Sequence, residues 1–149
     1  RKRSSSQKLI LKPNFNEKAA LVKFYPGLDP NIIEWYVNEG YRGIILEGTG
    51  LGHVSKYCFS AIRNAIENNV IVAMTSQCIW GRLGMNVYDQ GRDLLAIGVV
   101  PLEDMLPETA LVKLMWVLGQ TKDIAEAKSL LTTNVANEFS PRTQAEETT

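Results

Sequence analysis

Short apolar runs alternate with amphipathic segments along this chain, and glycine or proline separates most of them. The runs are rich in β-branched residues and carry apolar side chains at consecutive positions, which is typical of strands buried on both faces. We expect strands in the ranges 19–25, 43–46, 70–74 and 98–100.

The segments between these runs have the spacing of helices that bury one face. The clearest case follows the second run, where apolar residues recur at i, i+3, i+4, i+7 and i+8. These residues are Cys58, Ala61, Ile62, Ala65 and Ile66. We therefore expect one buried helix face there, with Cys58 in the core.

Capping residues, prolines and glycines mark the ends of the other predicted helices. Asp29 and Pro30 begin one that Gly40 ends, Gly98 stops one from Asp89 to Ile97, Pro107 begins one that Gly119 ends, and Thr121 caps the last. This alternation predicts an α/β domain, a small doubly wound (Rossmann- or flavodoxin-like) parallel sheet with helices on both faces.

Composition fits one compact domain with polar ends, because 45% of the 149 residues are hydrophobic. We divide the chain into a polar linker (1–8), the α/β domain (9–139) and a flexible tail (140–149). Arg1 takes the place of an initiator methionine, so we expect the rear part of a longer polypeptide.

Charge, apolar content and cysteine number argue against nucleic-acid binding, membrane insertion and a disulfide framework. With 16 basic and 16 acidic side chains the formal net charge is zero, which argues against direct nucleic-acid binding by this domain. No apolar run approaches the ~20 residues that span a bilayer. Two cysteines are too few for a disulfide framework. We expect a cytoplasmic protein with no membrane contact.

Ligands of parallel sheets bind beyond the carboxyl ends of the strands, which directs attention to the loops there. In the loop 47–53 glycine stands at every other position, so backbone N–H groups can approach a ligand or another chain. Its G-x-G-x-G spacing differs from the dinucleotide pattern, and no Lys-Ser or Lys-Thr pair ends it as in a Walker loop. A tight turn that packs at an interface is the alternative.

Hydroxyl, amide and thiol groups follow the third predicted strand, and such groups suit amide recognition. Both loops follow parallel strands, so we expect them to share one edge of the sheet. We name as candidate substrate- or effector-binding residues Gly48, Thr49, Gly50, Ser76, Gln77 and Cys78. The alternative is that these polar groups satisfy one another and bind nothing.

A catalytic role for the cysteines needs a base, and His53 is the only histidine. Cys78 with His53 is a possible dyad, but a lone cysteine and a lone histidine are more often packing or surface residues. Both cysteines lie in apolar stretches of the sequence. Two cysteines and one histidine match no zinc pattern. We expect neither a catalytic residue nor a metal in this chain.

Three segments of the chain resemble the second domain of the L-asparaginases, and together they extend the likeness over residues 9–143. They are 43–54 (GIILEGTGLGHV), 74–88 (MTSQCIWGRLGMNVY) and 103–116 (EDMLPETALVKLMW). Within that superfamily the 86–92 run and the 107–116 run look more like the asparaginase-type subunits of archaeal tRNA-dependent amidotransferases than like free-standing asparaginases.

The resemblance implies an enzyme that releases ammonia from glutamine, or asparagine in relatives, for the conversion of Glu-tRNA(Gln) to Gln-tRNA(Gln). ATP and Mg would be used by the partner subunit, so no cofactor is expected in this chain. The family's nucleophilic threonine lies in the amino-terminal domain, and this chain alone should be inactive. The implied partners are that missing catalytic domain, a second copy in a homodimer, and a tRNA-binding subunit.

Two departures from the family pattern concern direct substrate contact. Many family dimers use an asparagine in the glycine loop and an acid after the third strand to close the partner's active site. Leu51 and Tyr88 occupy those places here. Cytosolic type I asparaginases have an allosteric pocket around a Thr-Gln-Cys segment, which Ser76-Gln77-Cys78 matches. Three hypotheses stay open: a noncatalytic amidotransferase domain, an effector-binding domain, and a dimerisation scaffold.

Overall fold

The computed structural model describes residues 10–142, so the expected linker (1–8) and most of the expected tail lie outside the described residues. Four parallel strands form one sheet in the order β1-β2-β3-β4. The strands are β1 (Ala19–Lys23), β2 (Gly43–Gly48), β3 (Ile71–Ser76) and β4 (Val100–Pro101). The helices are α1 (Asn31–Asn38), α2 (Phe59–Glu67), α3 (Asp89–Ile97), α4 (Pro107–Gln120) and α5 (Ile124–Thr132).

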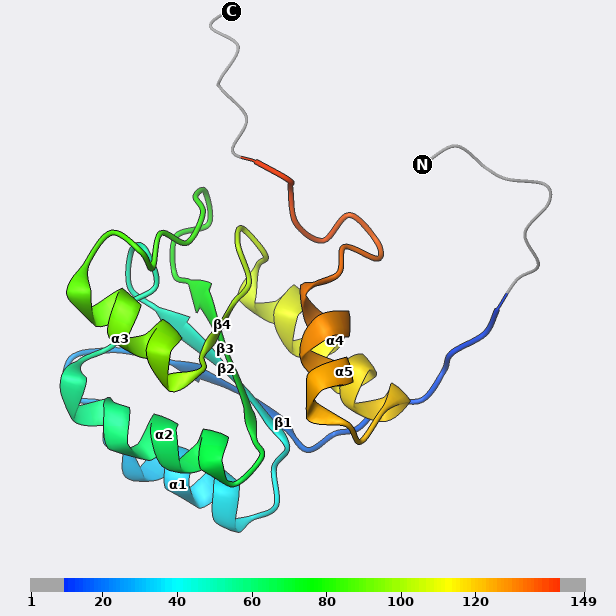
Figure 1. Cartoon of the computed structure of the whole chain (residues 1–149), viewed down its shortest axis with the longest axis horizontal. Coiled ribbons are helices and arrows are strands. Elements are labelled where there is room, and N and C mark those ends of the chain that lie inside the picture. Colours follow the sequence, from blue (N-terminus) through cyan, green and yellow to red (C-terminus); the bar gives the residue numbers. More distant parts are fainter. Residues whose placement is uncertain (1–9, 143–149) are drawn as a thin grey trace, which may run out of the picture.

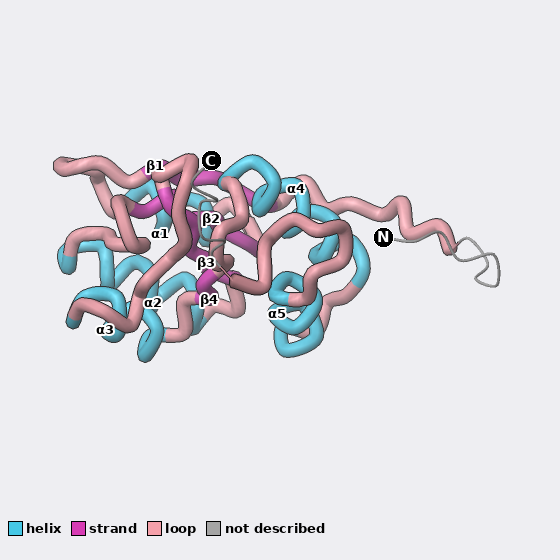
Figure 2. The backbone as a smooth tube through the Cα atoms, turned by 90° about the horizontal axis from the view of Figure 1, so that it is seen from above, coloured by secondary structure: helices cyan, strands magenta, loops and turns pink. Residues whose placement is uncertain are grey.

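Helices cover both faces of the sheet, in two separate groups. The crossover helices α1, α2 and α3 lie together on one face, while α4 and α5 cover the other (Figures 1 and 2). Since the strand order follows the chain order, crossovers of the same hand place successive helices on the same side. The predicted α/β class, a parallel sheet covered on both faces, is confirmed.

Both faces of β2 are buried, as its consecutive apolar residues predicted. Ile44 and Leu46 belong to the core with α1, α2 and α3, whereas Ile45 belongs to the core with α4 and α5. None of the three side chains is more than 1% exposed. Adjacent strand residues point to opposite faces, so one continuous apolar run serves two cores.

Several predicted helix ends are wrong in detail. The residue that caps α5 is Asp123, whose carboxylate accepts a 2.7 Å hydrogen bond from Glu126 N. Thr121 lies upstream of it and accepts instead from Asp123 N. At α1 the capping position is Pro30, and Asp29 accepts from Asn31 N at 2.9 Å. The expected stop of α3 at Gly98 is confirmed by its φ of 107°.

Gly119 lies inside α4 and does not end it. A Cβ atom at this position would collide with the backbone of Asn14 and Phe15. The glycine is therefore required for the close approach of another segment, a role that a capping argument from the sequence misses.

That segment is the N-terminal strap, which we define as residues 10–17, and it runs along α4. Asn16 N donates to Met115 O at 2.9 Å and Trp116 Nε1 donates to Lys12 O at 3.1 Å. Gln120 adds a bond to the strap, from Nε2 to a backbone carbonyl at 2.7 Å. Side chains of α4 thus fix a segment that carries no regular secondary structure.

A second segment without helix or strand, the C-terminal strap (residues 133–141), also packs on α4. The Lys113 ammonium donates to Thr133 O at 2.6 Å and forms an ion pair with Glu138, and both side chains are 7% exposed. Burial alone would raise the pKa of Glu138, but hydrogen bonds from Lys113 and from backbone N–H groups of the strap lower it to about 2.

The C-terminal strap also contacts the loops at one end of the sheet. Ser140, the first residue of the expected tail, donates from its N–H to Asp104 at 2.8 Å. Its carbonyl accepts a hydrogen bond from Arg82, which also pairs with Glu103. Burial tends to raise the pKa of Asp104, but the bonds from Ser140 and the charge of Arg82 lower it overall.

Candidate functional site at the carboxyl edge of the sheet

The loops that follow β2 and β3 lie on the same edge of the sheet, as expected. The two strands are parallel and in register from Gly43 opposite Ile71 to Gly48 opposite Ser76, so both end at the same level. The loop after β1 reaches this edge too, because Lys23 pairs with Glu47 in the ladder.

Gln77 ties three strand ends together. Its side-chain amide donates to the carbonyl of Phe24 at 2.5 Å and to that of Glu47 at 3.0 Å, and its backbone N–H donates to Gly48 O at 2.9 Å. The donors of this predicted binding residue are thus engaged with the backbone. Its present role is to hold the loops after β1 and β3 against the end of β2.

Ser76 links the glycine loop to the loop after β3. Its hydroxyl donates to Gly50 O at 2.6 Å and accepts from Cys78 N at 3.0 Å, and the residue is 8% exposed. Ser76 and Gln77 therefore bond within the edge itself. This is the arrangement that the alternative interpretation, mutual satisfaction of the polar groups, describes for these two residues.

The glycine loop is a closed turn. Thr49 N donates to His53 O at 2.9 Å, and the N–H groups of Gly52 and His53 both donate to Thr49 O at 3.0 Å. Gly50 and Gly52 have φ of 52° and 97°, which favour glycine. Gly48, by contrast, is the buried last residue of β2. The turn leaves the exposed Thr49 and Gly50 at the surface of the edge.

His53 and Cys78 do not form the dyad that was considered. No hydrogen bond joins them among residues 10–142, and Cys78 is exposed, not enclosed by apolar side chains. The imidazole packs against Tyr88, with ring centroids 5.4 Å apart. Cys58 is buried as expected, 1% exposed, and burial raises its pKa. In the described part of the chain, neither thiol is hydrogen-bonded to a base.

A hollow of about 470 Å³ beside the glycine loop brings together residues that the sequence interpretation did not combine. It is lined by His53, Lys56, Tyr88, Asp89 and Gln90. The His53 Nε2 atom is buried and finds no hydrogen-bond partner among the described residues. The hollow thus brings an ammonium, a phenol, a carboxylate and an amide to one place, a set suited to a polar ligand.

Apolar side chains are exposed in the loops after β3. Ile79 is 71% exposed, Trp80 92%, Val87 58% and Tyr88 60%. All four residues belong to the segment between β3 and α3. Their place in the apolar 79–80 and 87–88 pairs could have been recognised from the sequence, but their exposure could not.

The described part of the chain contains no group of three or more His, Cys, Asp or Glu side chains placed to hold a metal ion. Within residues 10–142, every helix is too short or too polar to cross a bilayer.

The fold and its loop edge define a small α/β domain, and sequence comparison assigns the family. The chain belongs to the glutaminase/asparaginase C-terminal domain family, which matches residues 18–131. The resemblance inferred from the motifs is confirmed.

Particular relatives narrow the assignment. The D subunit of glutamyl-tRNA(Gln) amidotransferase from Methanopyrus kandleri is 58% identical over 125 residues, 84% of this chain and 27% of the relative. The protein of the same name from Pyrococcus horikoshii is 51% identical over 143 residues, 96% of this chain and 33% of the relative. The chain thus spans about a third of the length of these relatives.

Solved structures agree with the fold. The thermostable L-asparaginase from Thermococcus kodakarensis superposes with a TM-score of 0.86 at 28% identity, over 95% of this chain and 44% of that one. L-asparaginase I from Vibrio cholerae gives 0.82 at 27% identity, over 91% of this chain and 41% of that one.

Proposed function

We propose that this chain is the noncatalytic domain of an amidotransferase subunit that releases ammonia from glutamine for conversion of Glu-tRNA(Gln) to Gln-tRNA(Gln). The observation that carries the proposal is the 51 to 58% identity to relatives named as the D subunit of glutamyl-tRNA(Gln) amidotransferase. This is about twice the 27 to 28% identity to the two L-asparaginase structures.

In this proposal the domain supports a homodimer and completes an active site whose nucleophile belongs to a separate catalytic domain. The exposed Ile79, Trp80, Val87 and Tyr88 support this role, because they lie in the loops after β3 and would be covered by another polypeptide. The hollow at His53 adjoins the same loops and provides polar groups at the border of the apolar surface.

Leu51 cannot replace an asparagine in amide recognition, because its side chain has no polar atom. Its carbonyl accepts from Gly84 N at 3.0 Å, which holds the glycine loop against the loop after β3. The candidate site residues Gly48, Thr49, Gly50, Ser76, Gln77 and Cys78 then act mainly by shaping this edge. The exposed Thr49 and Cys78 are left to meet the substrate or the second copy.

The proposed complex acts in the cytoplasm, where charged tRNA is used. Its ATP and Mg belong to the partner subunit, which also holds the tRNA, and this domain contributes no cofactor site. The released ammonia is the product that the partner subunit consumes.

A second candidate function is the effector-binding or dimerisation domain of a cytosolic type I L-asparaginase. The superposition on L-asparaginase I, with a TM-score of 0.82, favours it. The bonding of Ser76 and Gln77 to backbone carbonyls weighs against it, because their donors are already used. The amidotransferase assignment therefore stands first.

A chimera tests the proposal. Residues 10–142 replace the matching domain of the Pyrococcus horikoshii relative, and glutamine-dependent Gln-tRNA formation is measured with its partner subunit. We expect an active complex. Trp80→Ala should weaken activity or assembly by about 30-fold, since truncating a covered aromatic residue at an interface costs about 2 kcal/mol.

The matched control is Trp35→Ala. Trp35 is a half-exposed tryptophan of α1, a helix outside the loop that carries Trp80. It should leave activity within about twofold of the parent, as expected for a surface substitution. A folded chimera that releases no ammonia would count against the amidotransferase assignment. If the two substitutions had equal effects, Trp80 would have no special role at an interface, but the amidotransferase assignment would be unaffected.

A further inference from the structure

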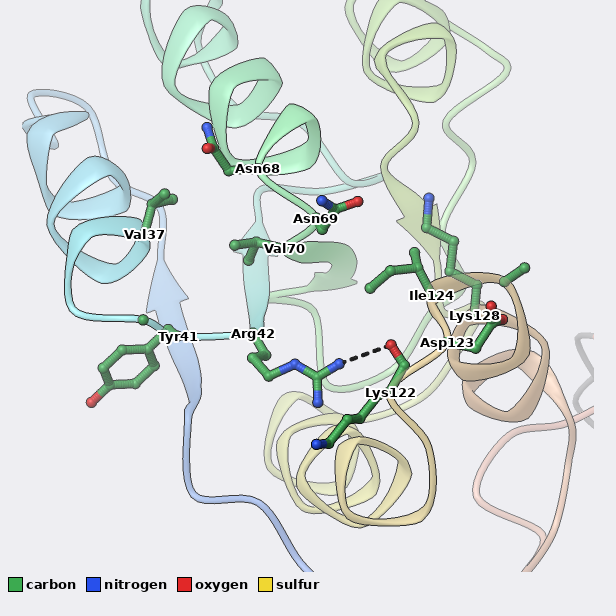
Figure 3. Close-up of a pocket in the computed structure, with 12 residues that line it drawn as sticks. Val37, Tyr41, Arg42, Asn68, Asn69, Val70, Lys122, Asp123, Ile124 and Lys128 are labelled. Carbon is green, nitrogen blue, oxygen red and sulfur yellow. Dashed lines mark hydrogen bonds between the residues drawn. The ribbon is translucent and has the colours of Figure 1, made fainter.

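A large cavity lies at the amino edge of the sheet, opposite the candidate site. Its volume is about 960 Å³, and its walls come from the end of α1, the α2–β3 turn and the α4–α5 linker (Figure 3). The strands begin at this edge, so the cavity is separated from the loops after β2 and β3 by the length of the sheet.

Three cations line this cavity: Arg42, Lys122 and Lys128. None of them forms an ion pair with a carboxylate among residues 10–142. Asp123 is the acidic residue of the lining, and its carboxylate already accepts from Glu126 N as the α5 cap. Three positive and one negative side chain give the lining a net charge of two positive, in a chain whose net charge is zero.

The guanidinium of Arg42 is oriented by the protein. Its Nη2 atom donates to Lys122 O at 3.2 Å, and Figure 3 shows the group turned toward the α4–α5 linker. Within the described residues this bond leaves the remaining N–H groups of the fork available, and a planar fork is suited to anions with two or more oxygens. The Arg42 guanidinium is therefore held in place and still has N–H groups that can bind an anion.

Backbone groups of both signs lie around the cavity, so its net positive charge comes from the side chains. The C-terminal carbonyls of α1 and α2 lie at this edge, but following N–H groups take several of them, from Gly40 to Val37 O and from Asn69 to Ile66 O, both at 3.0 Å. The amino end of α5, including Ala125, faces the cavity. The amino end of a helix carries partial positive charge.

We propose that this cavity binds a small molecule carrying a phosphoryl group. A phosphate monoester holds about −1.5 to −2 charge at pH 7, which balances the net charge of the lining. RNA is the less suitable ligand, because backbone binding neutralises about six to ten phosphates and the cavity offers three cations. The site is independent of the proposed amidotransferase function.

The full chain is titrated with inorganic pyrophosphate to test the proposal. Calorimetry measures binding, and the unfolding temperature is measured with and without the ligand. We expect saturable binding that raises the unfolding temperature, because a ligand of the native state stabilises it. Lys122→Gln should weaken binding about tenfold, the value of one hydrogen bond to a charged group. Lys122 contacts Arg42 through its backbone carbonyl, which the substitution keeps, so this variant folds even where Arg42→Gln does not.

Arg63→Gln is the matched control, since Arg63 is an exposed arginine of α2 outside the cavity. It should bind pyrophosphate like the parent. An equal response to malonate would overturn the phosphoryl assignment in favour of charge alone. A short RNA duplex that binds more tightly than pyrophosphate, and loses binding in Lys122→Gln, would overturn the small-molecule assignment. The absence of pyrophosphate binding by a folded chain would overturn the proposal altogether.

Discussion

The hydroxyl of Ser76 donates a 2.6 Å hydrogen bond to the carbonyl oxygen of Gly50, twenty-six residues earlier in the chain. The hydroxyl oxygen of Ser76 in turn accepts a hydrogen bond from Cys78 N. One buried side chain therefore joins the glycine loop to the loop after β3.

Ser76→Ala should destabilise the domain by about 1 to 2 kcal/mol, because it leaves the Gly50 carbonyl and the Cys78 N–H without their partner. Urea unfolding measures the change. Ser60→Ala, at an exposed position of α2, is the control and should stay within about 0.5 kcal/mol of the parent. Equal stability of the two variants would show that the bond between the loops contributes nothing.

Lys113→Met should destabilise the domain by about 3 kcal/mol at pH 7, because it leaves the Glu138 carboxylate buried without its cation. Lys23→Met is the control. Lys23 pairs with Glu47 but its side chain is 63% exposed, and such pairs contribute less than about 1 kcal/mol. Unfolding in guanidinium chloride gives both values.

The pH dependence of the parent follows from Glu138. Its pKa lies at about 2 in the folded chain and at 4.5 ordinarily. The folded state thus binds the proton less readily than the unfolded state, so the stabilisation is complete above the ordinary value and is lost as pH falls toward about 2. The gap between parent and Lys113→Met should therefore shrink over that range. A constant gap from pH 7 down to about pH 2.5 would contradict the assignment of the low pKa to this pair.

Gly119→Ala should release the N-terminal strap. Alanine favours a helix over glycine by about 1 kcal/mol, but its methyl group would collide with the backbone of Asn14. Hydrogen exchange at the Asn16 amide, which donates to Met115 O, reports the release. Gln120→Ala removes one bond to the strap without the collision and should accelerate exchange less. Unchanged protection in Gly119→Ala would contradict the close approach.

The isolated chain should hydrolyse neither glutamine nor asparagine, because an amidase needs an activated nucleophile and Cys78 is bonded to no base among residues 10–142. Ammonia release is measured for the parent and for Cys78→Ser. Both should match the buffer alone. Steady release that disappears in Cys78→Ser would restore the cysteine as a nucleophile.

The sheet could be predicted from the sequence because β2 and β3 are short runs that are apolar at consecutive positions, a pattern typical of strands covered on both faces. The helix ends were harder. Thr121 and Asp123 both have capping side chains, and the choice between them depends on where the backbone turns. The role of Gly119 was equally hard to predict. A glycine is needed there because the backbone of the N-terminal strap, far away in the sequence, packs against it.

At the candidate site the sequence predicted the shared edge but not how its polar groups are used. Parallel strands fix which loops meet. Whether the Gln77 amide meets a ligand or the carbonyl of Phe24 depends on ångström-scale distances, which no sequence pattern encodes. The hollow at His53 was missed because it joins His53 and Lys56 to the start of α3, more than thirty residues later in the sequence, where the imidazole packs against Tyr88.

The bond from Trp116 to Lys12 spans 104 residues, and this separation has a kinetic consequence during synthesis. At translation rates of about 5 to 20 residues per second, the N-terminal strap leaves the ribosome roughly 5 to 20 s before α4 has been made. The β1 to β3 sheet with α1 and α2 can pair during that interval. The apolar face that α4 will cover stays exposed meanwhile, so the nascent chain presents a surface that can aggregate until α4 has been made.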